Sequence, residues 1–371
     1  MTGIPVVSAA ANFGERIGQT RRAIAERDDI DALIISDLNN VRWLTGLASS
    51  NAAALVTEAQ VLLVTDSRYA QRAIAVDPLI DVVVYRAALA TVLSAAIEAG
   101  VRTVGVEAES LSLASFEGLK TAIHETATEL VATTGVIESL RATKDDSEVA
   151  ALAMACTIST DALGALLPQI APGMTEVQIA RQLEFEMGKA GAQDRAFETI
   201  VATGPNSAIP HHVPGTRALA AGDFLKIDFG AMYDGYHADC TRTFIVGGEP
   251  TDRQVAVYEV VKAAASAARA ALVPGIEVAQ LDSIAREVLA ESQLDELFTH
   301  GLGHGVGLAI HESPLLAASA AGTIPSGAVV TIEPGVYLPG EFGVRIEDTC
   351  HVTDSGVTIL TEFTRELTRI A

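Results

Sequence analysis

The sequence predicts an α/β N-terminal domain followed by an α+β C-terminal domain. In residues 1–139, short β-rich runs alternate with alanine-rich helical stretches, which is the pattern of an α/β domain. In residues 140–371, helical stretches instead precede two segments with the pattern of β-hairpins. A chain of 371 residues, 49% of them hydrophobic, is long and apolar enough to build a core in each of two domains.

The expected N-terminal domain contains four β-rich runs, which are residues 32–35, 61–65, 81–85 and 103–106. The boundary is expected between residues 139 and 140, because charge interrupts the β-rich pattern in the segment SLRATKDDSEV. Asp145 or Asp146 can cap the long helix that follows. A capping box formed by Thr175 and Gln178 starts another helix, whose pattern fades at residues 188–191.

The first predicted hairpin spans residues 224–246 and turns at Asp234-Gly235, a strong signal for a two-residue turn. If Tyr233 pairs with Tyr236 across this turn, the two residue numbers of every pair in the hairpin sum to 469. Asp228 and Asp239 then become diagonal neighbours on one face of the hairpin. Two close carboxylates repel each other unless a proton or a cation lies between them. We therefore favour a bound cation.

The second predicted hairpin, residues 329–352, carries Glu333 and Glu347 on its two arms, with a loop around residues 339–343. Both glutamates have odd numbers, so they are expected to share a face, because side chains alternate along a strand. The register stays open, since this loop is longer and Pro334 removes a ladder donor directly after Glu333.

Between the hairpins lies a glycine-rich segment, HGLGHGVGLAIHESP, in which four alternating glycines surround His304. Glycines are expected where the backbone passes close to another group, and His304 is the natural nitrogen ligand. Val306 stands where the dinucleotide-binding fingerprint requires its last glycine, so a Rossmann site is rejected. The sequence also lacks the H-E-x-x-H motif of a single-zinc peptidase.

Four carboxylates and one imidazole form a hard, oxygen-rich set of ligands. Such a set is more typical of a site for Mn²⁺, Co²⁺ or Fe²⁺ than of a zinc site, which is often rich in thiolates. Two ions suit four carboxylates better than one ion does.

An internal repeat supports a metal pair. The APGM segment at residues 171–174 and the VPGI segment at residues 273–276 lie 102 residues apart, and each introduces an amphipathic helical stretch. The carboxylates of the two hairpins show similar spacings, of 105 and 108 residues. Two duplicated halves would place a metal pair on their pseudo-symmetry axis.

These motifs and their order resemble the creatinase, prolidase and aminopeptidase P group of metallopeptidases, peptidase family M24, which includes the methionine aminopeptidases. The matching segments are KIDFG, HADCTRTF, HGLGHGVGLAIHE, TIEPGVY and GVRIEDT, and FETIVATGPNSAIPHH resembles the upstream histidine segment of the family. The best resemblance is to bacterial Xaa-Pro dipeptidase and aminopeptidase P proteins. It implies a creatinase/prolidase-like α/β domain at residues 1–139 and an α+β pita-bread (creatinase/aminopeptidase-like) catalytic domain at residues 140–371.

The resemblance also implies roles for individual residues. Asp228 binds one metal ion, His304 and Glu333 bind the second, and two carboxylates bridge both ions, Asp239 and Glu347. Glu333 also relays a proton to the leaving amine. Three histidines contact the scissile region and the proline ring, and an arginine orients the neighbouring carboxylates; these four residues are His211, His300, His311 and Arg345.

Four nearby residues are expected to be structural. Cys240 stands where the family pattern suggests an apolar residue such as methionine, and it is expected to pack. His212, His237 and His351 are expected to be local hydrogen-bonding or surface residues.

The predicted activity is hydrolysis of the Xaa-Pro bond at the N-terminus of peptides or in dipeptides (aminopeptidase P or prolidase type), with small peptides that carry proline at the second position as substrates. Two divalent metal ions are expected, Mn²⁺ first, with Co²⁺, Fe²⁺ or Zn²⁺ as alternatives. The alternatives are a strict Xaa-Pro dipeptidase, a creatinase-like amidinohydrolase that works without metal, and a non-catalytic binding module. The last two should have replaced ligands, and none is replaced here.

Charge and cysteine content narrow the possible partners. The formal charge of −22, from 25 basic and 47 acidic residues, argues against nucleic acid and anionic membranes. Three separate cysteines imply no disulfide framework, and neither a signal peptide nor a membrane-spanning run is expected. We therefore expect a soluble, cytoplasmic protein, and the family resemblance implies a homodimer formed through the N-terminal domain.

Overall fold

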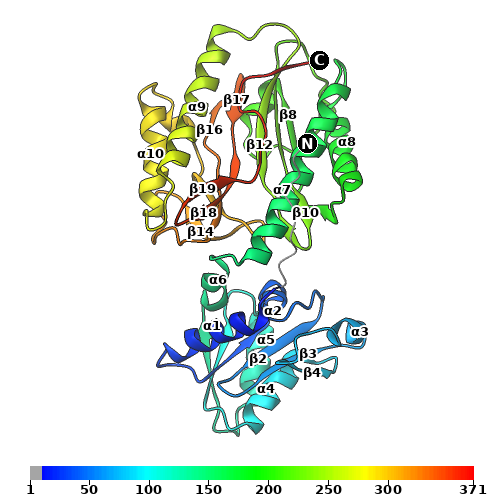
Figure 1. Cartoon of the computed structure of the whole chain (residues 1–371), viewed down its shortest axis with the longest axis vertical. Helices are drawn as coiled ribbons and strands as arrows, with labels where there is room; N and C mark the ends of the chain where they lie inside the picture. Colours follow the sequence, from blue (N-terminus) through cyan, green and yellow to red (C-terminus); the bar gives the residue numbers. More distant parts are fainter. Residues whose placement is uncertain (1–10) are drawn as a thin grey trace. The chain divides into compact units, whose positions relative to one another are not determined.

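The computed structural model describes residues 11–371, which form two compact units that divide between Arg141 and Ala142 (Figure 1). The expected boundary between residues 139 and 140 falls inside α6 (Val136–Arg141), the last helix of the first unit. Residues 1–10, which belong to the segment where no signal peptide is expected, lie outside the described residues.

The first unit is an α/β domain, as predicted, built on a six-stranded sheet of order β4-β3-β2-β1-β5-β6. One face of the sheet packs against α4 and α5 through buried aliphatic side chains. The four predicted β-rich runs correspond to β1, β3, β4 and β5, whereas β2 and β6 were not predicted. Before α6, the elements of this unit are, in chain order, α1 (Phe13–Ala25), β1 (Ala32–Ile35), α2 (Leu38–Thr45), β2 (Ala52–Val56), β3 (Val61–Thr65), α3 (Ala70–Ala73), β4 (Asp81–Val84), α4 (Ala88–Glu98), β5 (Thr103–Glu107), α5 (Leu113–Ala122) and β6 (Glu129–Thr133).

The second unit consists of two similar halves, and each half contributes two helices and a sheet whose strands are antiparallel, except that β20 joins the sheet of the first half parallel to β12. The first half contains α7 (Asp146–Leu166), η1 (Leu167–Gln169), α8 (Glu176–Ala190), β7 (Asp194–Arg195), β8 (Ile200–Thr203), η2 (Gly204–Ala208), β9 (Phe224–Phe229), β10 (Ala231–Tyr233), β11 (Tyr236–His237) and β12 (Cys240–Val246). The second half contains α9 (Asp252–Ala271), α10 (Val278–Ala290), η3 (Asp295–Leu297), β13 (Gly303–Gly305), β14 (Glu312–Leu316), β15 (Val329–Ile332), β16 (Gly335–Leu338), β17 (Phe342–Arg345), β18 (Asp348–Thr353), β19 (Gly356–Ile359) and β20 (Arg369–Ile370).

The strands of the second unit lie between the two helix pairs, with α7 and α8 on one side and α9 and α10 on the other (Figure 1). The two main sheets have the orders β20-β12-β9-β8 and β14-β13-β15-β18-β19. The order β8-β9-β12 in the first half therefore matches β13-β15-β18 in the second half.

The local geometry confirms the predicted repeat. In both Pro-Gly turns the glycine has a positive φ, 89° at Gly173 and 85° at Gly275, a conformation that favours glycine. Each turn then makes an isolated antiparallel bridge to a later segment, Thr175 to Ala218 in the first half and Glu277 to Thr323 in the second. The two halves therefore share their turns as well as their strand order.

The predicted helix starts are also correct. Asp145 caps α7 through a capping box with Glu148, and Thr175 caps α8 through a capping box with Gln178. α8 ends at Ala190, because Gly191 adopts the left-handed conformation that closes a helix.

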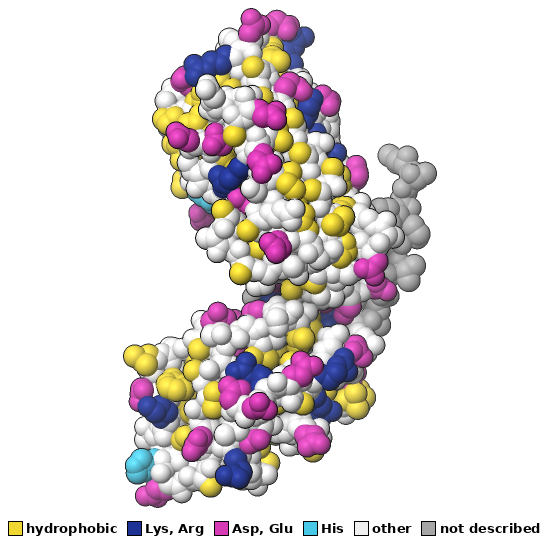
Figure 2. All heavy atoms as spheres, turned by 90° about the vertical axis from the view of Figure 1, so that its left-hand side faces the viewer, with side chains coloured by type: hydrophobic (Ala, Val, Ile, Leu, Met, Phe, Trp, Pro, Cys, Tyr) yellow, Lys and Arg dark blue, Asp and Glu magenta, His cyan; other side chains and the backbone are white. Residues whose placement is uncertain are grey.

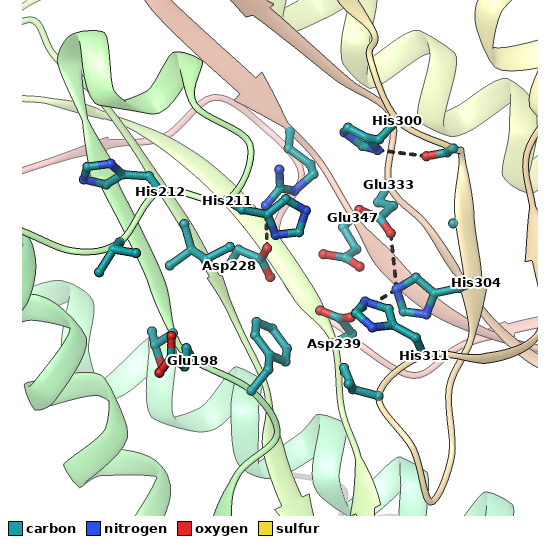
Figure 3. A pocket seen from close by; sticks show the side chains of 18 of the residues that line it. Glu198, His211, His212, Asp228, Asp239, His300, His304, His311, Glu333 and Glu347 are labelled. Atoms are coloured by element: carbon teal, nitrogen blue, oxygen red, sulfur yellow. Dashed lines mark hydrogen bonds and ion pairs between the residues drawn. The ribbon is translucent and has the colours of Figure 1, made fainter. Parts of the chain in front are cut away.

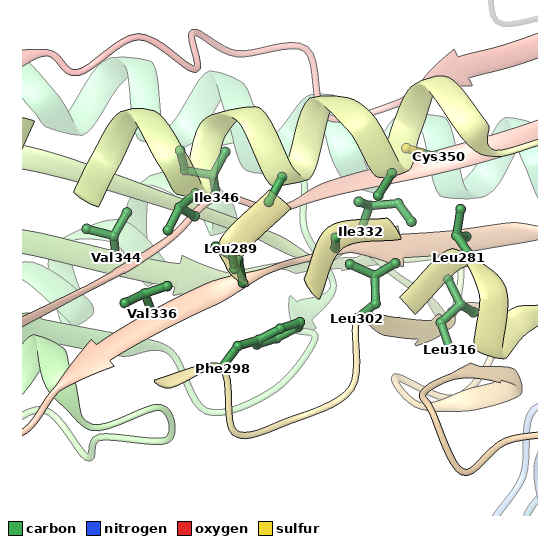
Figure 4. Packing of buried hydrophobic residues seen from close by; sticks show 14 of the residues in the cluster. Leu281, Leu289, Phe298, Leu302, Leu316, Ile332, Val336, Val344, Ile346 and Cys350 are labelled. Carbon is green, nitrogen blue, oxygen red and sulfur yellow. The ribbon is translucent and has the colours of Figure 1, made fainter. Parts of the chain in front are cut away.

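Alternation along the hairpins separates two cores from a polar face. In the second hairpin, even-numbered side chains such as Ile332, Val344 and Ile346 pack against α9 and α10 (Figure 4). The odd-numbered Glu333 and Glu347 point to the other face, as the period of two requires. In β9, Ile227 likewise enters the core formed with α7 and α8, while its neighbours on the opposite face are polar.

One helix among the described residues, Asp146–Gln169, is long and apolar enough to cross a membrane by length and composition alone. It spans α7 and η1. About 56% of the most apolar stretch of this helix is buried inside the protein, and Leu163 and Leu166 belong to the core of the first half. Packing within the unit therefore accounts for its apolar composition.

The acidic excess is spread along the chain. Figure 2 shows acidic side chains dispersed over the visible face of both units, with basic side chains between them. The formal charge of −22 is therefore not confined to one segment.

Candidate metal centre

The first hairpin brings two aspartates together in the predicted register. Tyr233 pairs with Tyr236 and Thr241 pairs with Asp228, so the paired numbers sum to 469 as expected. Carboxylate oxygens of Asp228, Asp239 and Glu347 all lie within 4.8 Å of one another, and all three residues are buried.

The second hairpin places its glutamates directly opposite each other. Ile332 pairs with Asp348 and Gly335 pairs with Arg345, so a single register continues across the interruption at Pro334. Glu333 and Glu347 occupy facing positions in this register, and the expectation that they share a face is confirmed.

Thr241 ties the second hairpin to the first. Its carbonyl oxygen accepts a hydrogen bond from the backbone N–H of Glu347 at 3.1 Å. Its hydroxyl also donates to Glu347 Oε2 at 2.6 Å. These two bonds fix both the backbone and the carboxylate of Glu347 beside the aspartates.

His304 supplies a nitrogen atom aimed at the carboxylates. Its Nδ1 lies 3.0 Å from the carbonyl oxygen of Gly305, which can only accept, so Nδ1 carries the proton and Nε2 keeps a free lone pair. Nε2 lies 3.4 Å from Glu333 Oε1 and 3.6 Å from Asp239 Oδ2. Burial lowers the pKa of His304 to about 4. A neutral acceptor therefore faces two further acceptors, an arrangement that requires a proton or a cation between them.

The glycines beside His304 allow its strand to approach its neighbours. A Cβ atom at Gly303 would lie 2.0 Å from the carbonyl oxygen of Thr331, and one at Gly305 would lie 2.2 Å from that of Ser313. No side chain fits at either position. The prediction that these glycines mark a close approach is confirmed.

The carboxylate cluster has too little positive charge around it. Burial, followed by the charge of neighbouring carboxylates, raises the pKa values of Asp239 and Glu347 well above their ordinary range. Burial likewise raises the pKa of Glu333 to about 8. Asp228 Oδ1 is buried without a hydrogen-bond partner. An orphaned oxygen and an oxygen-rich donor set are features that divalent cations would satisfy, so the residues fit a metal centre.

Arg345 is the cation that contacts this cluster within the described chain. Its guanidinium donates to Asp228 Oδ2, to the hydroxyl of Thr241 at 3.0 Å and to the hydroxyl of Tyr337 at 2.6 Å. These contacts hold the guanidinium of Arg345 against the carboxylate of Asp228.

A cavity of about 370 Å³ opens onto the cluster (Figure 3). Apolar side chains, including Phe197, Ile200 and Ile310, form part of its wall. Every site residue predicted from the sequence lines it: His211, Asp228, Asp239, His300, His304, His311, Glu333, Arg345 and Glu347.

The three pocket histidines differ in their contacts. Both ring nitrogens of His300 are engaged, Nδ1 with the carbonyl of Gly301 and Nε2 with the hydroxyl of Tyr337, each at 2.8 Å. Burial, followed by the charge of Arg345, lowers the pKa of His300 to about 3. The ring of His311 meets that of His304 edge-on, with 4.4 Å between their centroids. His211 is exposed to the cavity and makes no hydrogen bond within the described residues.

The residues expected to be structural have local contacts. His212 Nε2 bonds Glu176 at 2.8 Å, and His237 Nδ1 lies 3.0 Å from the carbonyl of Gly307. His351 is partly buried on β18. Cys240 is fully buried, and burial raises the pKa of its thiol to about 12, so it packs as expected.

Sequence reasoning missed several residues that support the site. Glu176 is buried and accepts hydrogen bonds from Thr203, Asn206, His212 and Gly215, so it holds the segment that carries His211 and His212. No local signal marks Glu176, because it looks like an ordinary first-turn acid of a helix.

Of the two missed lysines, one could have been located from the sequence and the other could not. Lys226 shares a strand face with Asp228, so the alternation Leu-Lys-Ile-Asp-Phe could have located it beside the site. Lys144 forms a buried ion pair with Glu312 at 2.8 Å, which sequence spacing does not reveal.

Comparison with known proteins decides the family. Residues 150–354, more than half of the chain, match the family described as metallopeptidase family M24, and residues 16–143 match the creatinase/prolidase N-terminal domain. The chain belongs to metallopeptidase family M24.

Individual relatives of this M24 peptidase cover most of its length. It is 40% identical to a Xaa-Pro dipeptidase of Pyrococcus horikoshii over 268 residues, which are 72% of this chain and 75% of the relative. An Xaa-Pro dipeptidase structure from Bacillus anthracis matches with a TM-score of 0.92 and 34% identity, over 96% of this chain and 100% of the other. An X-Pro aminopeptidase structure from Thermotoga maritima matches with a TM-score of 0.85 and 34% identity, over 94% and 99%. The predicted pita-bread fold with its N-terminal domain is thereby confirmed.

Proposed function

We propose that this M24 peptidase hydrolyses the Xaa-Pro bond at the N-terminus of peptides and in Xaa-Pro dipeptides, with the help of two divalent metal ions. The observation that carries the proposal is a cluster of three buried carboxylates beside His304, whose free Nε2 lies 3.6 Å from one of them, Asp239, and 3.4 Å from a fourth carboxylate, Glu333. Asp228 would hold one ion, His304 and Glu333 the other, and two carboxylates would bridge them, Asp239 and Glu347.

The charges support two ions rather than one. Four ionised carboxylates outnumber the single positive charge of Arg345, which contacts Asp228. One divalent cation would leave the cluster negative, whereas two would offset it. Mn²⁺ is our first choice, and Co²⁺, Fe²⁺ and Zn²⁺ share the same ligand chemistry. Bound there, the ions would polarise the scissile carbonyl and lower the pKa of water towards neutrality.

Residues of the chain would supply the proton transfers and the binding of the peptide. Glu333 would also relay a proton, because a carboxylate at this position can take one from the attacking water and return it to the leaving nitrogen of proline. His211 and His311 line the cavity beside the cluster and can donate to the oxygen of the scissile carbonyl.

The cavity suits a short peptide. Its volume of about 370 Å³ lies at the small end of ligand pockets, and its apolar wall can cover the proline ring. A dedicated pocket matters, because the Xaa-Pro bond has no N–H and general peptidases rely on that group. Known relatives include both a dipeptidase and an aminopeptidase, and we propose the broader activity, with strict Xaa-Pro dipeptidase as the alternative.

The first experiment is hydrolysis of Ala-Pro and Ala-Pro-Ala by protein stripped with a chelator and reloaded with Mn²⁺. Cleavage of both peptides supports the aminopeptidase P activity, and cleavage of Ala-Pro alone supports the strict dipeptidase. Glu333→Ala should lower kcat by about 10⁴-fold or more. Glu341→Ala is the matched control, since this exposed residue lies in the turn of the same hairpin. Bound metal without cleavage of either peptide would refute the Xaa-Pro assignment.

Two alternatives keep the fold without this activity. A creatinase-like amidinohydrolase works without metal, and a binding module would not turn over any peptide. Neither alternative accounts for the complete set of five metal-ligand residues. Metal analysis of the purified protein, together with assays on creatine, separates them from the peptidase.

We further propose a cytoplasmic homodimer. The three free, buried cysteines fit a reducing compartment. The match of residues 16–143 to the creatinase/prolidase N-terminal domain supports pairing through this domain, as the family resemblance implies. Light scattering of the purified chain tests the dimer.

A further inference from the structure

His211 reaches the cavity without a hydrogen bond of its own. Among residues 11–371, no donor or acceptor contacts its ring, although it lies close enough to influence the pKa values of His300 and His311. The backbone on either side must therefore hold it in place. This backbone is the irregular segment 204–213, which begins with η2 and has no sheet ladder to support it.

Lys226 holds the backbone that precedes His211. The lysine lies on β9 and is fully buried. Its Nζ lies 3.0, 2.8 and 3.4 Å from the carbonyl oxygens of Ser207, Ile209 and Pro210. An ammonium group has three donors and no acceptor, so three carbonyls match its capacity. The ring of Tyr337 covers the ammonium, with its centroid at 4.9 Å from Nζ.

Other contacts complete the support of this segment. Gly343 N–H donates to the Ser207 hydroxyl at 2.9 Å, and the guanidinium of Arg345 lies 3.4 Å from the carbonyl of Pro210. On the far side of His211, His212 bonds the buried Glu176. Lys226 differs from these partners because it gathers three backbone carbonyls of residues 207–210 at one point directly before His211.

We propose that Lys226 is a positioning residue for His211, and that it sets the place of the imidazole in the cavity through the carbonyls of Ser207, Ile209 and Pro210. The catalytic part of this proposal rests on the proposed function, because it requires His211 to act on the substrate. The structural part does not, since it concerns only the order of segment 204–213.

The structural part is tested by hydrogen–deuterium exchange on the metal-free full chain. Lys226→Met keeps the length of the side chain and removes its donors. Peptides covering residues 204–213 should exchange about tenfold faster or more, whereas peptides covering residues 298–312 should be unchanged. Lys189→Met, on the exposed surface of α8, is the matched control and should change neither. Unchanged exchange in segment 204–213 would overturn the proposal.

A graded variant covers the case in which Lys226→Met does not fold. Lys226→Gln keeps an amide with two donors, so it should give exchange between that of the wild type and that expected for the full loss of donors. Wild-type exchange in this variant would equally overturn the proposal.

The catalytic part is tested by a double-mutant cycle with the Mn²⁺-loaded protein and Ala-Pro. Lys226→Met should lower kcat/KM by about ten- to a hundredfold with the bound metal unchanged, because small misplacements of a catalytic group have effects of this size. If Lys226 acts through His211, adding Lys226→Met to His211→Ala should cause no further loss. Losses that multiply would show a different role for Lys226. If the wild type cleaves no Xaa-Pro peptide, the proposed function fails, while the exchange experiment still decides the positioning.

Discussion

Raising the pH should destabilise the metal-free catalytic domain through Glu333. Burial raises the pKa of this carboxyl from its ordinary value of 4.5 to about 8 in the folded protein. The folded state therefore binds the proton more tightly than the unfolded state does. The resulting stabilisation is complete below pH 4.5 and is lost as the pH rises through about 8.

The size of the effect follows from the two pKa values. A tenfold difference in proton affinity corresponds to about 1.4 kcal/mol, so the whole effect of a rise from 4.5 to about 8 is roughly 5 kcal/mol. Between pH 5.5 and pH 8.5, roughly 3 kcal/mol of this stabilisation should disappear. For a domain of this size, such a change lowers the thermal unfolding midpoint by roughly 5–10 °C.

Glu333→Gln isolates this effect, because the amide mimics the protonated carboxyl and does not titrate. The comparison must be made at each pH, since His300 and His304 act in the opposite sense. Their lowered pKa values, about 3 and about 4, make their contribution to stability improve as the pH rises towards 6.5. The two histidines are present in both proteins, so their contribution is expected to cancel. Asp239 and Glu347 titrate in the same sense as Glu333, and the Glu333 charge adds to the rise of their pKa values, so the difference between the proteins includes this part of their response.

The assay is differential scanning calorimetry in chelator at pH 5.5, 7 and 8.5. The variant should gain roughly 3 kcal/mol on the wild type across this range. With Mn²⁺ at pH 7 and above, the bound ions replace the proton, and the wild type should instead be the more stable protein. A variant that follows the wild type in parallel at all three pH values would refute the reasoning.

Two further predictions concern packing around the site. Gly303→Ala should greatly reduce metal binding, measured by metal analysis, because the new Cβ would lie 2.0 Å from the carbonyl oxygen of Thr331; Gly118→Ala, in open space on α5, is the control and should melt at the wild-type temperature or slightly above. Lys144→Met should lower the free energy of unfolding of the catalytic domain by roughly 3–5 kcal/mol, because it removes one partner of the buried pair with Glu312. Adding Glu312→Gln should restore part of this loss, and a denaturation series that shows no restoration would contradict the pairing.

Local signals allowed the first half of the site to be predicted from sequence. The turn residues Asp234 and Gly235 both have positive φ, 44° and 71°, as a two-residue hairpin turn requires. Once this turn is known, the register of β9 and β12 follows by counting, and so does the shared face of Asp228 and Asp239. The turn preference of two neighbouring residues was therefore enough to predict the relative positions of Asp228 and Asp239.

The register of the second hairpin depends on contacts that the sequence does not show. Pro334 interrupts the strand, and local reasoning cannot tell whether the register shifts there. In the structure, the N–H of Glu333 donates to the carbonyl of Leu302 at 2.8 Å, on a neighbouring segment. This segment, which leads directly into β13, spans the gap in the register, and it lies about thirty residues earlier in the chain.

The supporting charges were missed for a different reason. Sequence rules place lysine and glutamate on the surface, yet Lys226 and Glu176 are fully buried. Their partners are backbone groups of the irregular segment 203–215, whose path cannot be derived from periodicity. Burial of a charge becomes predictable only when the groups that satisfy it are known.

The hairpins explain why a stable fold carries an unfavourable cluster of charges. Alternation sends one face of each hairpin into a core, against α7 and α8 in the first half and against α9 and α10 in the second. The opposite faces must then meet each other, and they carry the carboxylates. Arg345 compensates only part of this charge, through Asp228. Removing one of the ionised carboxylates that Arg345 does not contact should therefore stabilise the metal-free protein, which indicates that these carboxylates serve the bound ions rather than folding.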